Sequence, residues 1–184
     1  MMVKVIEKTK PVAPYAGLPA ILAAMLLLRA GDADAFILLL RGLIVIFGYV
    51  ASVFDLKEKR IPNGLILAML ASWVLVMVPK LFLDTDDAVA LIADSIIGFA
   101  TGGGLFLIVY IISRKGLGGG DVKFMAASGL YLGFGGTLPA MLFGTVLAAL
   151  AGLALMALKK IGRKDKIPLA QFLYAGILIT VFLQ

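Results

Sequence analysis

The sequence contains no cysteine and no histidine, and charged residues make up only 15 % of its 184 residues. The missing cysteines exclude disulfides, cysteine-ligated zinc and a cysteine nucleophile, and the missing histidines exclude a Ser-His-Asp mechanism. Apolar residues are abundant instead. They make up 62 % of the chain, against roughly 45–50 % in a soluble domain. The composition predicts an integral membrane protein, with no metal site and no nucleic-acid partner.

Long apolar runs divide the chain, and a membrane helix needs about 20 apolar residues. We expect an all-α, polytopic membrane helix bundle of about six to seven transmembrane helices, forming one membrane-embedded domain over residues 1–184. Residues 1–34 would hold an N-terminal tail and an extra first span, and residues 35–184 the core. The first run also resembles a signal peptide that ends at a small-residue site, Ala33-Asp34-Ala35. The runs cover residues 14–28, 35–54, 62–78, 88–113, 122–134, 137–158 and 167–183.

The basic residues predict the orientation of these spans, since cytoplasmic loops are enriched in lysine and arginine. Counting from a cytoplasmic N-terminus places 14 of the 17 basic residues on the inner side. The outer segments carry Arg29 and Lys80, and Arg41 falls inside the second run. We therefore expect the N-terminus in the cytoplasm, the C-terminus outside and seven crossings of the cytoplasmic membrane.

Two acidic residues fall at the inner ends of their spans. Asp55 ends the second run, and Asp121 opens the fifth after three glycines. A pair of carboxylates, one ionised and one protonated, can activate water and polarise a scissile carbonyl. The alternatives are that Asp121 is a helix N-cap and that Asp55 is a solvated loop acid paired with Lys59. Judged from its own helix end, Asp121 would ionise more easily and act as the base, and Asp55 as the acid.

The residues around both acids form two motifs that resemble the type IV prepilin peptidases. These are intramembrane aspartyl proteases of the GxGD type, with preflagellin peptidases as archaeal relatives. The late segments Lys166-Ile167-Pro168 and Phe172-Leu173 are also similar to this family. The motifs are Asp55 followed by Arg60-Ile61-Pro62-Asn63, and Gly118-Gly119-Gly120-Asp121-Val122-Lys123 followed by Gly129 and Leu132-Gly133.

The resemblance implies that Asp55 and Asp121 are the catalytic pair. It implies cleavage of a short basic leader from pilin-like precursors at the cytoplasmic face of the membrane, with the substrate helix still in the bilayer. Many members also methylate the new N-terminus with S-adenosylmethionine and carry a four-cysteine zinc module. This chain has no cysteine, so it resembles the short form associated with Flp/Tad-type pili or archaeal flagellins. We expect no cofactor.

Residues flanking the acids are expected to shape the site. The glycines allow close backbone approach of an extended substrate, or form a flexible connector. Pro62 fits the first turn of the third span, and Lys123 either anchors the inner end or holds a substrate oxygen. These active-site loop residues are Arg60, Pro62, Asn63, Gly118, Gly119, Gly120 and Lys123.

Arg41 and Asp94 are ionisable residues well inside predicted spans. Charges within a membrane are costly and tend to pair or face cavities, so we expect a structural pair between the second and fourth spans. Small residues in the fourth and sixth runs, such as Gly98, Gly102 and Gly144, have the spacing of close helix packing, within one chain or between protomers.

Two other classes of function fit the same composition. One is a small transporter or channel whose acids bind ions or protons, although such sites usually lie near the midplane of the bilayer. The other is a scaffold that binds pilin-like helices without cutting them. The sequence leaves the oligomeric state and the identity of the precursor open.

Overall fold

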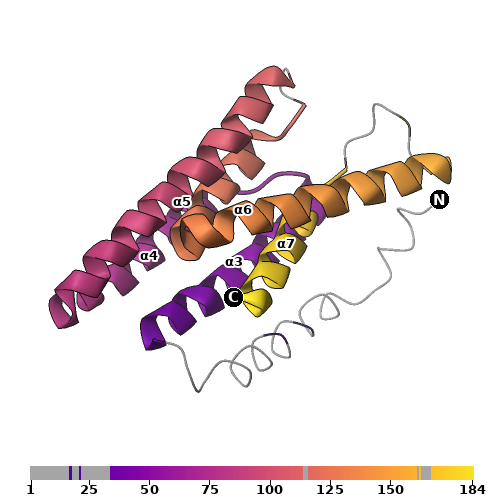
Figure 1. Cartoon of the computed structure of the whole chain (residues 1–184). Coiled ribbons are helices and arrows are strands. Elements are labelled where there is room, and N and C mark those ends of the chain that lie inside the picture. Colours follow the sequence, from indigo (N-terminus) through magenta and orange to yellow (C-terminus); the bar gives the residue numbers. More distant parts are fainter. Residues whose placement is uncertain (1–16, 18–20, 22–33, 114–115, 161, 163–166) are drawn as a thin grey trace.

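The computed structural model describes residues 17, 21, 34–113, 116–160, 162 and 167–184. Over these residues the chain is helical and contains no strand, which confirms the predicted all-α class (Figure 1). Apart from Gly17 and Ile21, the first apolar run lies outside the described residues. The helices are α3 (Ala35–Glu58), α4 (Asn63–Leu83), α5 (Thr85–Ile112), α6 (Gly119–Ala157) and α7 (Ala170–Leu183).

Four of these helices, α3 to α6, are long and apolar enough to cross a membrane, and α7 is a shorter apolar helix. Large apolar side chains point outward along them; Ile96, Leu107 and Leu142 are examples. In water such exposure would be unfavourable, whereas lipid tails solvate it. The protein is therefore a membrane helix bundle, and the number of crossings and their orientation stay predictions.

Helix α6 contains a break at Gly133, where φ is 64° and ψ is −175°. Backbone angles in this region are essentially restricted to glycine. Figure 1 shows the ribbon of α6 changing direction sharply part-way along its length. The sequence predicts separate spans over residues 122–134 and 137–158, and the structure places the boundary between the two half-helices at Gly133.

Glycines let the two half-helices of α6 pack closely against different neighbours. The first half lies on α5, where a Cβ at Gly98 would collide with the carbonyl oxygen of Gly129 and one at Gly102 would lie 2.5 Å from that of Met125. The second half lies on α7, where a Cβ at Gly144 would be 2.9 Å from the Cα of Leu173. The small-residue spacing is thus used for packing within the chain.

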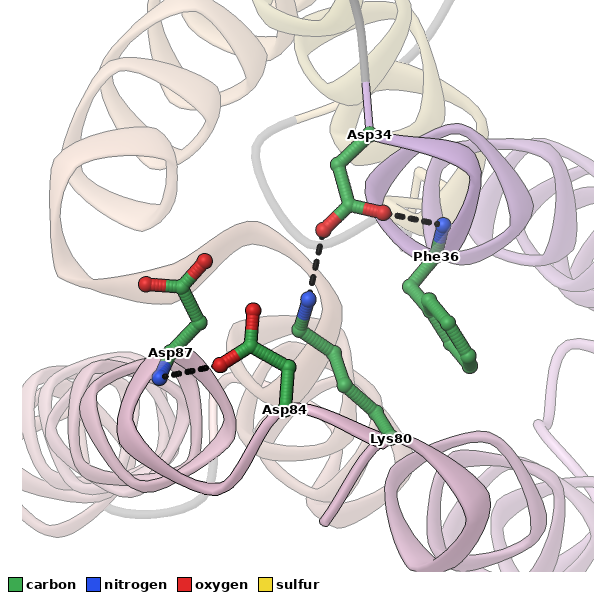
Figure 2. Close-up of polar contacts among 5 residues, drawn as sticks. All are labelled: Asp34, Phe36, Lys80, Asp84 and Asp87. Carbon is green, nitrogen blue, oxygen red and sulfur yellow. Dashed lines mark hydrogen bonds and ion pairs between the residues drawn. The ribbon is translucent and has the colours of Figure 1, made fainter. Parts of the chain in front are cut away.

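An ion pair joins α3 to α4 at the end of these helices that is remote from Asp55. The Nζ of Lys80 lies 2.5 Å from Oδ2 of Asp34, and the other oxygen of Asp34 accepts the N–H of Phe36 at the start of α3 (Figure 2). The hydrogen bond from Lys80 lowers the pKa of Asp34 below its ordinary value of 3.8. Residue 34 therefore caps α3 and ties it to the last turn of α4.

Candidate active site

Three helix ends meet around Asp55. This residue lies in the last turn of α3, and its side chain is only 6 % exposed. Its Oδ2 accepts the backbone N–H of Ala170, the first residue of α7, at 2.9 Å. The N–H groups of a first helical turn lack partners within the helix, so a carboxylate is well placed to accept from them. Asp55 is therefore a buried, tethered acid, and the interpretation as a solvated loop acid is wrong.

Asp121 is the third residue of α6, and its carboxyl group is near that of Asp55. The N-cap of α6 is Gly118, which has no side-chain capping bond, so the interpretation of Asp121 as an N-cap is also wrong. Its Oδ1 is buried and has no hydrogen-bond partner among the described residues. The charge of Asp55 acts on the Asp121 carboxyl group. The two acids therefore share one buried electrostatic environment.

The two sequence motifs touch each other beside the acids. The Nζ of Lys123 donates to Oδ1 of Asn63 at 3.0 Å. A Cβ at Gly120 would lie 3.3 Å from both the backbone nitrogen and the Cβ of Ile61, so glycine permits the first turn of α6 to lie directly on the α3–α4 connection. Motifs that are distant in sequence thus form one structural unit.

The remaining predicted residues of the loop occupy its edges. Pro62 is the N-cap of α4 rather than a residue of its first turn, and Asn63 begins the helix. Gly119 and Gly120 are already helical, whereas Gly118 is extended, with φ −73° and ψ 135°. Arg60 is exposed at the α3–α4 connection. The glycine motif is therefore an ordered helix start, which argues against the alternative of a flexible connector, and the approach of an extended substrate to these glycines stays a prediction.

Arg41 and Asp94 lie away from this site and line one cavity of about 150 Å³ together with Gly133. Both face the interior of the bundle, as an intramembrane charge requires. The Oδ1 of Asp94 accepts the N–H of Phe134 at 3.1 Å. The direct pairing of Arg41 with Asp94 stays a prediction, and the structure adds a backbone partner for Asp94.

Comparison with known proteins identifies the family. Residues 42–153 match the model of the type IV leader peptidase family. The chain belongs to this family. The matched stretch includes both acids, both motifs and the break in α6.

A curated relative supports this membership. Over 132 residues the chain is 26 % identical to the prepilin leader peptidase/N-methyltransferase of Bacillus subtilis (strain 168). The alignment covers 71 % of this chain and 50 % of the relative, so the chain spans about half the length of that protein. No solved structure matches.

Two members of the site were not predicted as site residues. Ile61 packs against the first turn of α6 at Gly120. Ala170 contributes only its backbone N–H, which no side-chain pattern reveals. The similarity of Ile167-Pro168 and Phe172-Leu173 to the family is the signal that points to this part of the chain. Among the described residues, no group of three or more acidic, histidine or cysteine side chains is arranged to hold a metal ion.

Proposed function

We propose that this leader peptidase is an intramembrane aspartyl endopeptidase. It removes the short basic leader of type IV pilin-like precursors (prepilins or preflagellins) at the cytoplasmic face of the membrane. The observation that carries the proposal is the meeting of Asp55 and Asp121. They come from different helices, Asp55 is buried and Asp121 is half-buried, and the two carboxyl groups lie within electrostatic range of each other. The family match covers both residues.

The environments of the two acids support distinct roles. Asp55 accepts a backbone N–H at the start of α7, and such a hydrogen bond stabilises a carboxylate. Asp121 also accepts a backbone hydrogen bond, from Gly118, but its Oδ1 is buried without a partner, which suits a protonated acid ready to donate. We assign Asp55 as the general base and Asp121 as the general acid. This reverses the roles expected from each residue's own helix end, because α7 supplies a second helix end beside Asp55.

These roles give a balanced hydrolysis. Asp55 takes a proton from water while the water oxygen attacks the carbonyl carbon of the scissile peptide, and Asp121 gives its proton to the carbonyl oxygen. The tetrahedral gem-diol intermediate collapses when the C–N bond breaks. The amine nitrogen receives the proton held by Asp55, and one hydroxyl of the intermediate returns its proton to Asp121, which restores the starting pair. The products are a leader with a new carboxyl group and a precursor with a new amino group. General acid and base catalysis of this kind contributes roughly 10²–10⁴-fold each.

The position of the acids at helix ends supports cleavage at the membrane boundary. A precursor with one apolar helix would keep that helix in the bilayer and present its leader junction at the level of Asp55 and Asp121. This hydrolysis needs only water and the two acids, so we propose no cofactor for it. The name of the curated relative includes an N-methyltransferase activity, and neither that activity nor S-adenosylmethionine is proposed for this chain.

Co-expression with a pilin-like precursor tests the proposal. The native chain should produce a leader-sized increase in the mobility of the precursor. Asp55→Asn and Asp121→Asn should each reduce the cleavage rate by roughly 10²-fold or more. Asp86→Asn is the matched control, because Asp86 is an exposed acid in the first turn of α5. Near-native cleavage by either catalytic-site variant would refute the assignment.

The same experiment separates the other two classes of function. A scaffold would co-purify with the precursor while leaving its mobility unchanged. A transporter or channel would leave the precursor intact and unbound. The break in α6 resembles the discontinuous helices of transporters, but Asp94 already occupies the start of its second half. The position of both motif acids at one end of the bundle favours the peptidase.

A further inference from the structure

The break in α6 depends on a side chain from another helix. At a break, the first N–H groups of the following half-helix lose their intrahelical acceptors. Asp94 of α5 supplies one, because its Oδ1 accepts the N–H of Phe134 at 3.1 Å. Its Oδ2 lies where a Cβ of residue 133 would stand, so only glycine fits beneath the carboxylate. Asp94 and Gly133 therefore form a matched pair that defines where α6 changes direction.

The direction of α6 at this break links the surroundings of the two acids. The half-helix before Gly133 carries Asp121 and packs on α5. The half-helix after Gly133 packs on α7, where a Cβ at Gly176 would lie 2.5 Å from the backbone nitrogen of Gly144. The first N–H of α7 in turn holds Asp55. A change of angle at the break would move Asp121 relative to the tether of Asp55.

We propose that Asp94 is a positioning residue for the catalytic pair. It lies far from the chemistry, because the stretch from Asp121 to Gly133 spans about 18 Å along a helix axis at 1.5 Å per residue. Asp94 acts by fixing the break at Gly133, and through it the first turn of α6 against the α3–α4 connection. This inference rests on the proposed peptidase function for its activity readout and has a second readout that does not.

The second readout is the rate at which an engineered disulfide forms between α6 and the α3–α4 connection. The chain has no native cysteine, so Ile61→Cys together with Gly120→Cys introduces a single pair. A Cβ at residue 120 would lie 3.3 Å from the Cβ of Ile61, close to the roughly 3.5–4.5 Å separation found in disulfides. The rate of disulfide formation under a mild oxidant reports whether the Asp121 turn is in place. It requires no precursor and no activity.

Three substitutions of Asp94 separate its contributions. Asp94→Asn keeps an oxygen acceptor for the N–H of Phe134 without the charge, and Asp94→Val removes the acceptor. Asp94→Ser keeps a hydroxyl oxygen but shortens the side chain, which withdraws that acceptor from the N–H of Phe134. It is the second test variant if the valine variant does not elute as a folded, monodisperse protein in detergent. Asp86→Val, an exposed change on the same helix, is the control.

The valine variant should form the 61–120 disulfide at least fivefold more slowly than the parent. When Asp94→Val is made without the two added cysteines, its kcat for leader cleavage should fall at least tenfold and its KM should stay within about twofold. Misplaced groups impair the transition state more than they impair binding. The asparagine variant and the Asp86→Val control should remain within about threefold on both readouts.

Three results would overturn the proposal. The valine or serine variant could retain both rates, or kcat could fall while disulfide formation stays at the parental rate. The asparagine variant could also fail as severely as the valine variant, which would make the charge of Asp94 decisive instead of its acceptor. If the native chain cleaves no precursor, the peptidase function fails while the disulfide rates still decide whether Asp94 positions the turn.

Discussion

A single methyl group at Gly118 should disable the site without straining the backbone. Gly118 has φ −73° and ψ 135°, which any residue can adopt. An alanine Cβ there would lie 2.6 Å from Oδ2 of Asp121, whereas ordinary contacts begin near 3.4 Å. The carboxylate would have to move by about 0.8 Å, and misplacement of a reacting group by about 1 Å can cost roughly 10²-fold in rate. We expect Gly118→Ala to lower kcat ten- to hundredfold.

The neighbouring glycines provide controls within the same motif. A Cβ at Gly119 meets nothing within 4 Å, and alanine is favoured over glycine in a helix by about 1 kcal/mol. Gly119→Ala should therefore cleave precursor within about twofold of the parent and unfold at the same or a higher temperature. Gly120→Ala, 3.3 Å from Ile61, requires a shift of only a few tenths of an ångström and should have an intermediate rate.

The assay is the time course of precursor cleavage with purified protein in detergent or liposomes, with thermal unfolding measured on the same samples. The reasoning predicts a rate order in which Gly119→Ala is fastest and Gly118→Ala slowest, at similar stability. Equal rates for Gly118→Ala and Gly119→Ala would refute it, because the predicted displacement of Asp121 would then be without consequence. A lower rate that merely follows a loss of folded protein would refute it as well.

Three further substitutions and one control test the fold. Lys59 has a positive φ of 53°, which costs roughly 1–2 kcal/mol for a residue with a Cβ, so Lys59→Gly should raise the unfolding temperature in detergent. Asp34→Asn should lower that temperature at pH 7. The difference should shrink as the pH falls below the ordinary carboxyl pKa of 3.8 and vanish only as the pH falls through the lower folded-state pKa, since Lys80 lowers the pKa of Asp34 in the folded state. Gly98→Ala should destabilise by roughly 1–3 kcal/mol through contact with α6, whereas Gly104→Ala, with nothing within 4 Å of its Cβ, should be neutral in the same melting assay.

The helices could be predicted because lipid imposes a simple rule on the sequence. Uninterrupted apolar stretches of sufficient length have few alternatives to a spanning helix. The second run, residues 35–54, became α3 at Ala35–Glu58, and the third, residues 62–78, became α4 at Asn63–Leu83. The starts agree within one residue, whereas the C-terminal ends lie several residues further along, because a helix continues past its apolar run as long as its backbone bonds can form. Composition therefore predicts the existence of these helices better than their ends.

The position of the break in α6 could not be predicted from local sequence. Gly133, Gly135 and Gly136 all offer the conformational freedom that a break needs. Gly133 adopts the special angles because Asp94 approaches it from α5 and captures the next N–H. That choice depends on how α5 and α6 pack, and the sequence alone shows neither the register nor the distance of this approach.

The chemistry of the site shows the same limit more sharply. Asp55 lies at the C-terminal end of α3, where the helix dipole disfavours a negative charge. In the structure the start of α7 lies beside it, and the N–H of Ala170 reaches its carboxylate from a position 115 residues along the chain. The electrostatic environment of a side chain is set by whichever helix ends are nearest in space, so an acid at one helix end can be held by another. For this reason the sequence can name the two acids, while only the packing of α7 indicates which of them is suited to take the proton from water.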